Sequence, residues 1–205
     1  MLRGRLHEVA FFASIPAGLI LLFFAPGPKA VIGALIYWLA LMAQFGTSAA
    51  YHVGAWGGRS RARMQKLDHA TIYVLIAGTY TPFCLVVLQR AQGISVLSIV
   101  WAGAAVGIVT TLYRTDLHML SGFLYLGLGW AAVIVFPALV RDLSTTELAL
   151  MVLGGLCYSG GALVLALHRP NPWPRTFGYH EVWHAATIGA AACLYCAILL
   201  VFLSS

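Results

Sequence analysis

The sequence predicts an all-α integral membrane protein with seven transmembrane helices. Hydrophobic residues make up 61% of its 205 residues and charged residues 9%, whereas a soluble domain is about 45–50% apolar and about 25% charged. The mean hydropathy is +0.88. Seven spans of ~20 residues each use most of the chain. We therefore expect residues 1–205 to form a single seven-helix transmembrane domain, and we exclude a soluble globular enzyme or a disordered chain.

Seven apolar runs define the predicted spans. In chain order they are residues 8–25, 30–53, 68–88, 94–113, 119–140, 147–167 and 179–203. The first run stops at a Pro-Gly-Pro segment, and the second stops before a pair of glycines that opens a basic loop. The sixth run ends at a proline-rich loop, since proline cannot donate to a helical ladder. Cleavage of the first run as a signal peptide is an alternative, but its length and the lack of a small-x-small site favour a retained helix.

The basic residues predict the orientation. The net charge is +6, and the Lys and Arg residues lie mostly in loops between apolar runs. One side of the membrane would carry Arg3, Arg5, Arg59, Arg61, Arg63, Lys66, Arg114, Arg169 and Arg175, and the other Lys29, Arg90 and Arg141. By the positive-inside rule the N-terminus is cytoplasmic and the C-terminus lies outside. This charge is explained by topology and lipid headgroups, so we expect membrane lipids rather than nucleic acid as partners.

All seven histidines fall at the predicted cytoplasmic ends of the spans. They are His7, His52, His69, His118, His168, His180 and His184. Four acidic residues, Glu8, Asp68, Asp116 and Glu181, are expected at the same end. Ionisable groups at a membrane boundary are functional candidates when they face the bundle interior.

Three of these histidines have the arrangement of a metal site. His180 and His184 are four residues apart and share one helix face, as do Ser48 and His52. Three imidazoles with an open fourth position are typical of catalytic zinc. Asp68 heads the next span and is the candidate general base, with Ser48 to orient it or the oxyanion.

Three other sequence features bear on alternative chemistries. Residues 180–184 read HEVWH and match the metalloprotease pattern HExxH, so Glu181 is an alternative base. Cys193 and Cys196 form a CxxC, which inside an apolar helix is more typical of packed thiols than of redox chemistry. A retinal protein is excluded, because the lysines, Lys29 and Lys66, lie outside the seventh span.

Four segments closely resemble the hemolysin III family, the bacterial branch of the progestin and adipoQ receptor (PAQR) family. They are residues 47–52 (TSAAYH), 67–83 (LDHATIYVLIAGTYTPF), 125–130 (YLGLGW) and 177–184 (FGYHEVWH). The resemblance implies seven helices with a cytoplasmic N-terminus. It also implies zinc held by His52, His180 and His184, with Asp68 linked to the zinc-bound water and Ser48 near the metal.

The first helix departs from the family pattern. Glu8 matches, but Phe11, Phe12 and Ile15 occupy the region where the family has Asn and His. No role of the first helix beyond Glu8 is therefore expected.

The resemblance suggests three functions. The first is a zinc-dependent hydrolase, ceramidase-like, that acts on a lipid amide or ester from the cytoplasmic leaflet of the bacterial inner membrane. The second is a non-enzymatic sensor or regulator of membrane state with a structural zinc. The third is a pore-forming cytolysin, which the confinement of polar residues to one end disfavours.

Overall fold

The computed structural model describes residue 2 and residues 4–113 and 118–205, so Arg3, Arg114 and Asp116 lie outside the described residues. Its helices, in chain order, are α1 (Arg5–Phe24), α2 (Pro28–Val53), α3 (Gly58–Val86), α4 (Arg90–Tyr113), α5 (His118–Gly129), the 3₁₀ helix η1 (Ala131–Val135), α6 (Phe136–Asp142), α7 (Thr145–Leu167) and α8 (Tyr179–Ser204). Seven segments are long and apolar enough to cross a membrane, with Gly122–Asp142 as the fifth. The seven-helix prediction is confirmed.

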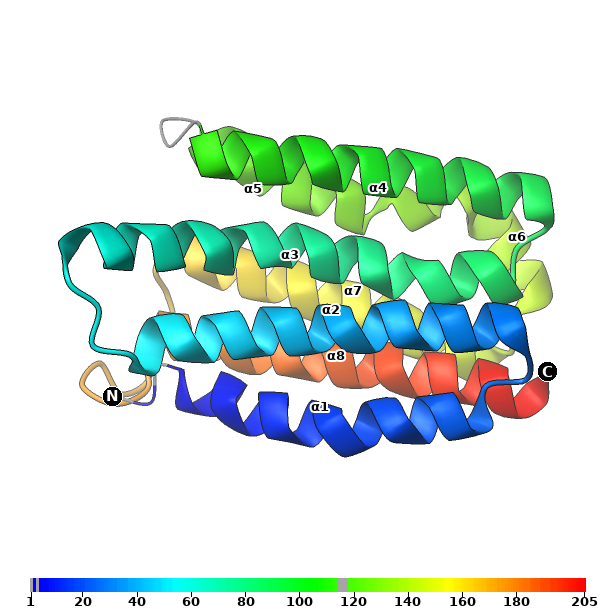
Figure 1. Ribbon diagram of the computed structural model, residues 1–205, viewed down its shortest axis with the longest axis horizontal. Coiled ribbons are helices and arrows are strands. Elements are labelled where there is room, and N and C mark those ends of the chain that lie inside the picture. The colour runs from blue at the N-terminus through cyan, green and yellow to red at the C-terminus, as the bar shows by residue number, and fades with distance from the viewer. Residues whose placement is uncertain (1, 3, 114–117) are drawn as a thin grey trace.

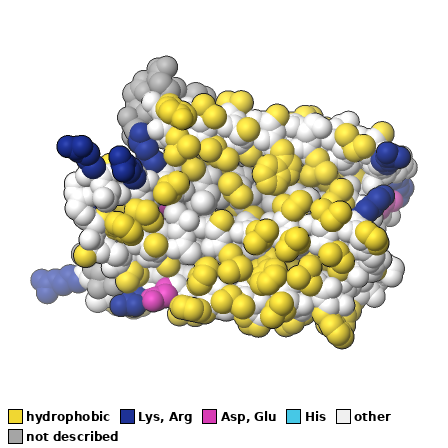
Figure 2. Space-filling view, in the orientation of Figure 1, with side chains coloured by type: hydrophobic (Ala, Val, Ile, Leu, Met, Phe, Trp, Pro, Cys, Tyr) yellow, Lys and Arg dark blue, Asp and Glu magenta, His cyan; other side chains and the backbone are white. Residues whose placement is uncertain are grey.

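The helices run along one axis as a bundle, with the N-terminus at one end and the C-terminus at the other (Figure 1). In the described chain α2 packs against α1 and α3, α3 packs against α4, and α7 packs against α8. Hydrophobic side chains cover the long side of the bundle, whereas Lys and Arg gather at its two ends (Figure 2). We call the end that carries the last turn of α2 and the first turn of α8 the histidine end.

The segment predicted as a basic loop is helical. Arg59, Arg61, Arg63 and Lys66 belong to the first turns of α3, which begins at Gly58. The residues between Gly58 and Asp68 include Arg, Met, Gln, Lys and Ala, all good helix formers, and neither Gly nor Pro interrupts them. Their charge keeps these residues out of the hydrocarbon region but does not prevent them from forming a helix. As a result, α3 carries a polar extension at the histidine end.

The predicted fifth span is interrupted. It consists of α5, the short η1 and α6, because Pro137 in the first turn of α6 has no N–H to donate to the preceding turn. Tyr80 of α3 satisfies the backbone groups at the break. Its hydroxyl donates to the Gly129 carbonyl at 2.7 Å and accepts from the Ala132 N–H at 2.8 Å. Because lipid offers no hydrogen bonds to such groups, Tyr80 makes the break tolerable inside a membrane.

Small residues allow α2 and α3 to approach closely, as expected for helices in membranes. A Cβ atom added at Gly78 would lie 2.5 Å from the Cβ of Ala40, far inside van der Waals contact. The α2 helix is also fixed to α8, since the fully buried Tyr37 donates from its hydroxyl to the Ala191 carbonyl at 3.2 Å. These contacts set the spacing of the helices that carry the histidines.

We predict that Gly78→Val destabilises the bundle by about 1–3 kcal/mol, the usual effect of overpacking a tight contact. Thermal unfolding in detergent measures the effect. Gly155→Val is the matched control, because an added Cβ at Gly155 meets no atom within 4 Å. Equal losses in the two variants would show that helix propensity, not the α2–α3 contact, is responsible.

Candidate metal centre

Three histidine side chains converge at the histidine end. His52 comes from the last turn of α2, and His180 and His184 come from the first two turns of α8. One ring nitrogen of each lies within 4.8 Å of the others. His184 is 2% exposed, and the other two are partly buried. The structure therefore brings together the three residues that the sequence proposed as metal ligands.

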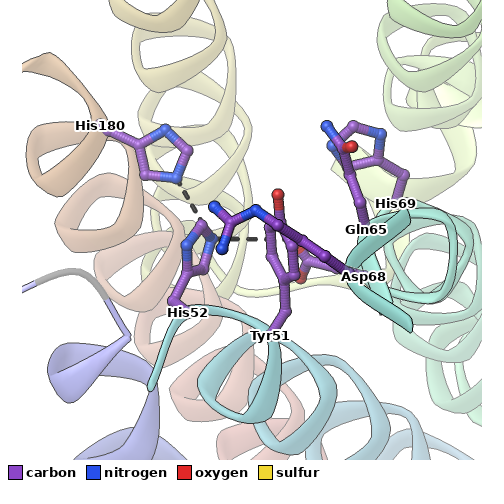
Figure 3. A pocket seen from close by; sticks show the side chains of 7 residues that line it. Tyr51, His52, Gln65, Asp68, His69 and His180 are labelled. Carbon is purple, nitrogen blue, oxygen red and sulfur yellow. Dashed lines mark hydrogen bonds and ion pairs between the residues drawn. The ribbon is translucent and has the colours of Figure 1, made fainter. Parts of the chain in front are cut away.

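The spacing of the His52 and His180 nitrogens fits a tetrahedral ion. The Nε2 atoms of His52 and His180 are 3.3 Å apart (Figure 3). Two nitrogens bound at about 2.0–2.1 Å to a tetrahedral zinc ion lie about 3.3–3.4 Å apart. Three neutral imidazoles are also a donor set that zinc and other divalent transition metals accept. These residues can hold a metal ion without a large rearrangement.

Asp68 places a carboxylate beside the cluster. Its Oδ2 lies 3.8 Å from Nε2 of His52, and both side chains are about 10% exposed. The other oxygen, Oδ1, is buried and has no hydrogen-bond partner among the described residues. Ser48, one turn before His52 and 1% exposed, interacts with the Asp68 carboxylate by a side-chain hydrogen bond. The Asp68 carboxylate thus lies between Ser48 of α2 and His52 of the cluster.

A pocket of about 300 Å³ opens beside the cluster. It is lined by Tyr51, His52, Arg61, Gln65, Asp68, His69 and His180. The labelled side chains come from the end of α2, the polar extension of α3 and the start of α8 (Figure 3). The pocket therefore connects two of the three candidate ligands and the carboxylate to the outside of the bundle.

Comparison with known proteins identifies the family of this chain. Residues 1–195 match the family model described as Haemolysin-III related. The chain belongs to the hemolysin III family. The chain is 31% identical over 197 residues to the Hemolysin-3 homolog of Bacillus subtilis, and the aligned region covers 94% of this chain and 89% of the relative. It is 28% identical to Hemolysin-3 of Bacillus cereus (94% and 87% covered). It is 27% identical to human Monocyte to macrophage differentiation factor (82% and 69% covered), which is consistent with the wider PAQR group.

In this hemolysin III protein the first helix contributes a residue that the sequence analysis missed. His7 lies within α1, not before it, and is 1% exposed. Its ring is stacked on that of His184, with centroids 4.0 Å apart and planes 10° apart. On another side the His7 ring lies beside the Phe45 ring, with the two centroids 5.1 Å apart. Neither of its ring nitrogens has a hydrogen-bond partner in the part of the chain that the structure describes. The first helix therefore brings a buried histidine against the cluster, a contact that the sequence analysis did not anticipate.

The stack predicts a specific effect of His7 on metal binding. An imidazole binds a metal in the plane of its ring, so a parallel ring against His184 restricts the direction of its ligand nitrogen. We predict that His7→Ala weakens metal binding about tenfold, the lower end of the effect of residues that orient ligands. His7→Phe, which keeps an aromatic face, should stay within about threefold of the parent.

Competition with a chelator of known affinity measures the loss, and thermal unfolding of the metal-free variants checks folding. If His7→Phe loses as much affinity as His7→Ala, the ring face is not what matters.

The remaining acidic and histidine candidates have other surroundings. Glu8 pairs with Arg5 at 2.6 Å and is partly exposed. Glu181, the alternative base, accepts from the Gly178 N–H at 2.9 Å and so caps the start of α8. His168 ends α7 in a left-handed conformation against Tyr179. His69 lines the pocket but is not in the three-histidine group, and the side chain of His118 lies outside the described residues.

Proposed function

We propose that this protein is a zinc-dependent hydrolase that acts on a lipid amide or ester and serves membrane homeostasis. The observation that carries the proposal is the convergence of three imidazole nitrogens within 4.8 Å of one another beside the buried Asp68 carboxylate. Catalytic zinc sites typically combine three protein ligands with one open position.

The residues divide the chemistry among them. His52, His180 and His184 would hold the zinc ion, which would supply an activated water and polarise a carbonyl group. The Asp68 carboxylate, whose Oδ2 lies 3.8 Å from Nε2 of His52, would take a proton from the attacking water and pass it to the leaving group. Ser48 orients the Asp68 carboxylate through its hydroxyl. This arrangement suits the hydrolysis of an acyl bond.

We place the site in the bacterial inner membrane, facing the cytoplasm. Arg5, Arg59, Arg61 and Arg63 flank the histidine end, whereas Lys29 and Arg90 begin helices at the opposite end. The excess of basic residues marks the cytoplasmic side. A site at this depth meets the headgroup region of the inner leaflet, where an acyl bond of a lipid lies.

The test is a lipid hydrolysis assay on protein purified in a maltoside detergent. Zinc-loaded and chelator-stripped samples are offered N-acyl sphingoid lipids, diacylglycerol and phospholipids, and released fatty acid is measured by mass spectrometry. We expect zinc-dependent release from at least one class. A zinc-loaded, folded protein that releases no acid from any class would contradict the proposal.

A second candidate function is a sensor of membrane state in which zinc is structural. It is favoured by the way the candidate ligands join α2 to α8, positions 128 residues apart for His52 and His180. On this reading, removal of zinc lowers the unfolding temperature, and no lipid is turned over. Measuring both quantities on the same samples separates the two functions.

A further inference from the structure

The pocket beside the histidine cluster has a composition that limits what can enter it. Among the described residues its walls contain one tyrosine, three histidines, an arginine, a glutamine and an aspartate, and no aliphatic side chain. The lining is more polar than apolar, whereas acyl chains bind in cavities lined mainly by hydrophobic side chains. The occupant of this pocket is therefore a polar group.

The polar extension of α3 supplies most of that wall. Arg61, Gln65 and Asp68, with His69, are spaced at three to four residues, so they share one face of α3. In Figure 3, Gln65, Asp68 and His69 lie on the α3 side of the pocket, across from His52 and His180. Arg61, Gln65 and His69 bring hydrogen-bond donors, and Asp68 brings the one carboxylate, which lies next to His52. The donors thus lie toward the mouth and the carboxylate toward the cluster.

Arg61 is the cation of this pocket. Its guanidinium lies over the Tyr51 ring, 5.5 Å from the centroid. Among the described residues it has no carboxylate partner, since Glu8 pairs with Arg5 and Glu181 caps α8. The aromatic ring restrains the guanidinium at the mouth while its N–H groups remain free to bind a ligand. Arg59 and Arg63, on the same extension, do not line the pocket.

We propose that the pocket binds an anionic phosphate group through Arg61, placing the rest of the ligand at the metal. Arginine matches phosphate with two parallel hydrogen bonds. A metal ion held by the histidines would add positive charge to the far wall of the same pocket. The phosphate belongs either to a phospholipid of the adjacent leaflet or to a water-soluble phosphate ester. As a statement of substrate class this rests on the proposed hydrolase, although the binding itself is independent of turnover.

The test is a binding measurement on zinc-loaded protein in maltoside micelles, which contain no phosphate. Glycerol 1-phosphate is titrated by calorimetry into the parent, Arg61→Gln and Arg61→Lys, with Arg59→Gln and Arg63→Gln as controls that remove the same charge outside the pocket. We expect about tenfold weaker binding for Arg61→Gln, a smaller loss for Arg61→Lys, and less than a twofold change in the controls. Zinc content of each variant verifies that the metal site is intact.

Equal losses of affinity in Arg61→Gln and the two controls would overturn the proposal in favour of general surface charge. Unchanged binding in Arg61→Gln would also overturn it.

A second arm of the experiment compares phosphatidylglycerol with diacylglycerol in the same micelles. Binding by the phospholipid but not by glycerol 1-phosphate identifies a lipid ligand, and binding by both identifies the headgroup alone as sufficient. If neither phosphate compound binds, the inference is wrong even where neutral lipids are hydrolysed. If phosphate binds through Arg61 but no lipid is turned over, only the hydrolase fails.

Discussion

Replacing His184 with alanine is expected to lower metal affinity by more than about a hundredfold. Mutation of a residue that only orients a ligand typically lowers metal affinity about tenfold to hundredfold. His184 is itself a candidate ligand, because its ring supplies one of the three nitrogens that lie within 4.8 Å of one another. It is also the most buried of the three, so no water can replace its nitrogen easily. His52→Ala should have the same effect, because a site reduced to two protein ligands no longer resembles a zinc centre.

Elemental analysis of detergent-purified protein measures this loss, with about one zinc per chain expected in the parent. His168→Asn is the control, since His168 is exposed, lies outside the cluster and has a left-handed conformation, φ 55°, that asparagine tolerates. A folded parent protein without metal would remove the basis of the site. Retention of metal by His184→Ala would show that the ion binds elsewhere.

The second large effect concerns Asp68. Asp68→Asn keeps the size and shape of a side chain that is 7% exposed but removes its ability to accept a proton. We expect turnover to fall about a thousandfold, within the range of general acid–base catalysis, while zinc content stays at about one per chain. Steady-state hydrolysis and elemental analysis of the same preparation test both parts.

Glu181→Gln is the matched control for Asp68→Asn. The amide oxygen of glutamine can still accept from the Gly178 N–H, so the cap of α8 is preserved. Turnover in this variant should stay close to that of the parent. Full activity in Asp68→Asn together with inactivity in Glu181→Gln would make Glu181 the base, as the HExxH pattern suggests.

Hydropathy predicted the seven spans because each helix must bury its backbone hydrogen bonds and face lipid with apolar side chains. The site was predictable for the same reason. Polar residues are rare in such helices, so His52, His180 and His184 stand out, and the four-residue spacing of the last two puts them on one face. Asp68 and Ser48 followed from their places beside these histidines.

The misses have local physical causes. Charge marked residues 59–66 as outside the membrane but carries no information on whether they are helical. The break in the fifth span depends on Tyr80, a partner far away in the sequence. His7 was missed because its importance lies in a ring stack with His184, and contacts between the first and last helices leave no periodic pattern in one sequence.

The origin of the candidate ligands has a consequence for biosynthesis. One ligand comes from the second helix and two from the last, with His52 and His180 separated by 128 positions. A nascent chain that has inserted only six spans carries His52 alone and cannot form the centre. A metal ion held by all three histidines would therefore bind only after the final helix has inserted, and we expect a truncated chain to stay metal-free in the membrane.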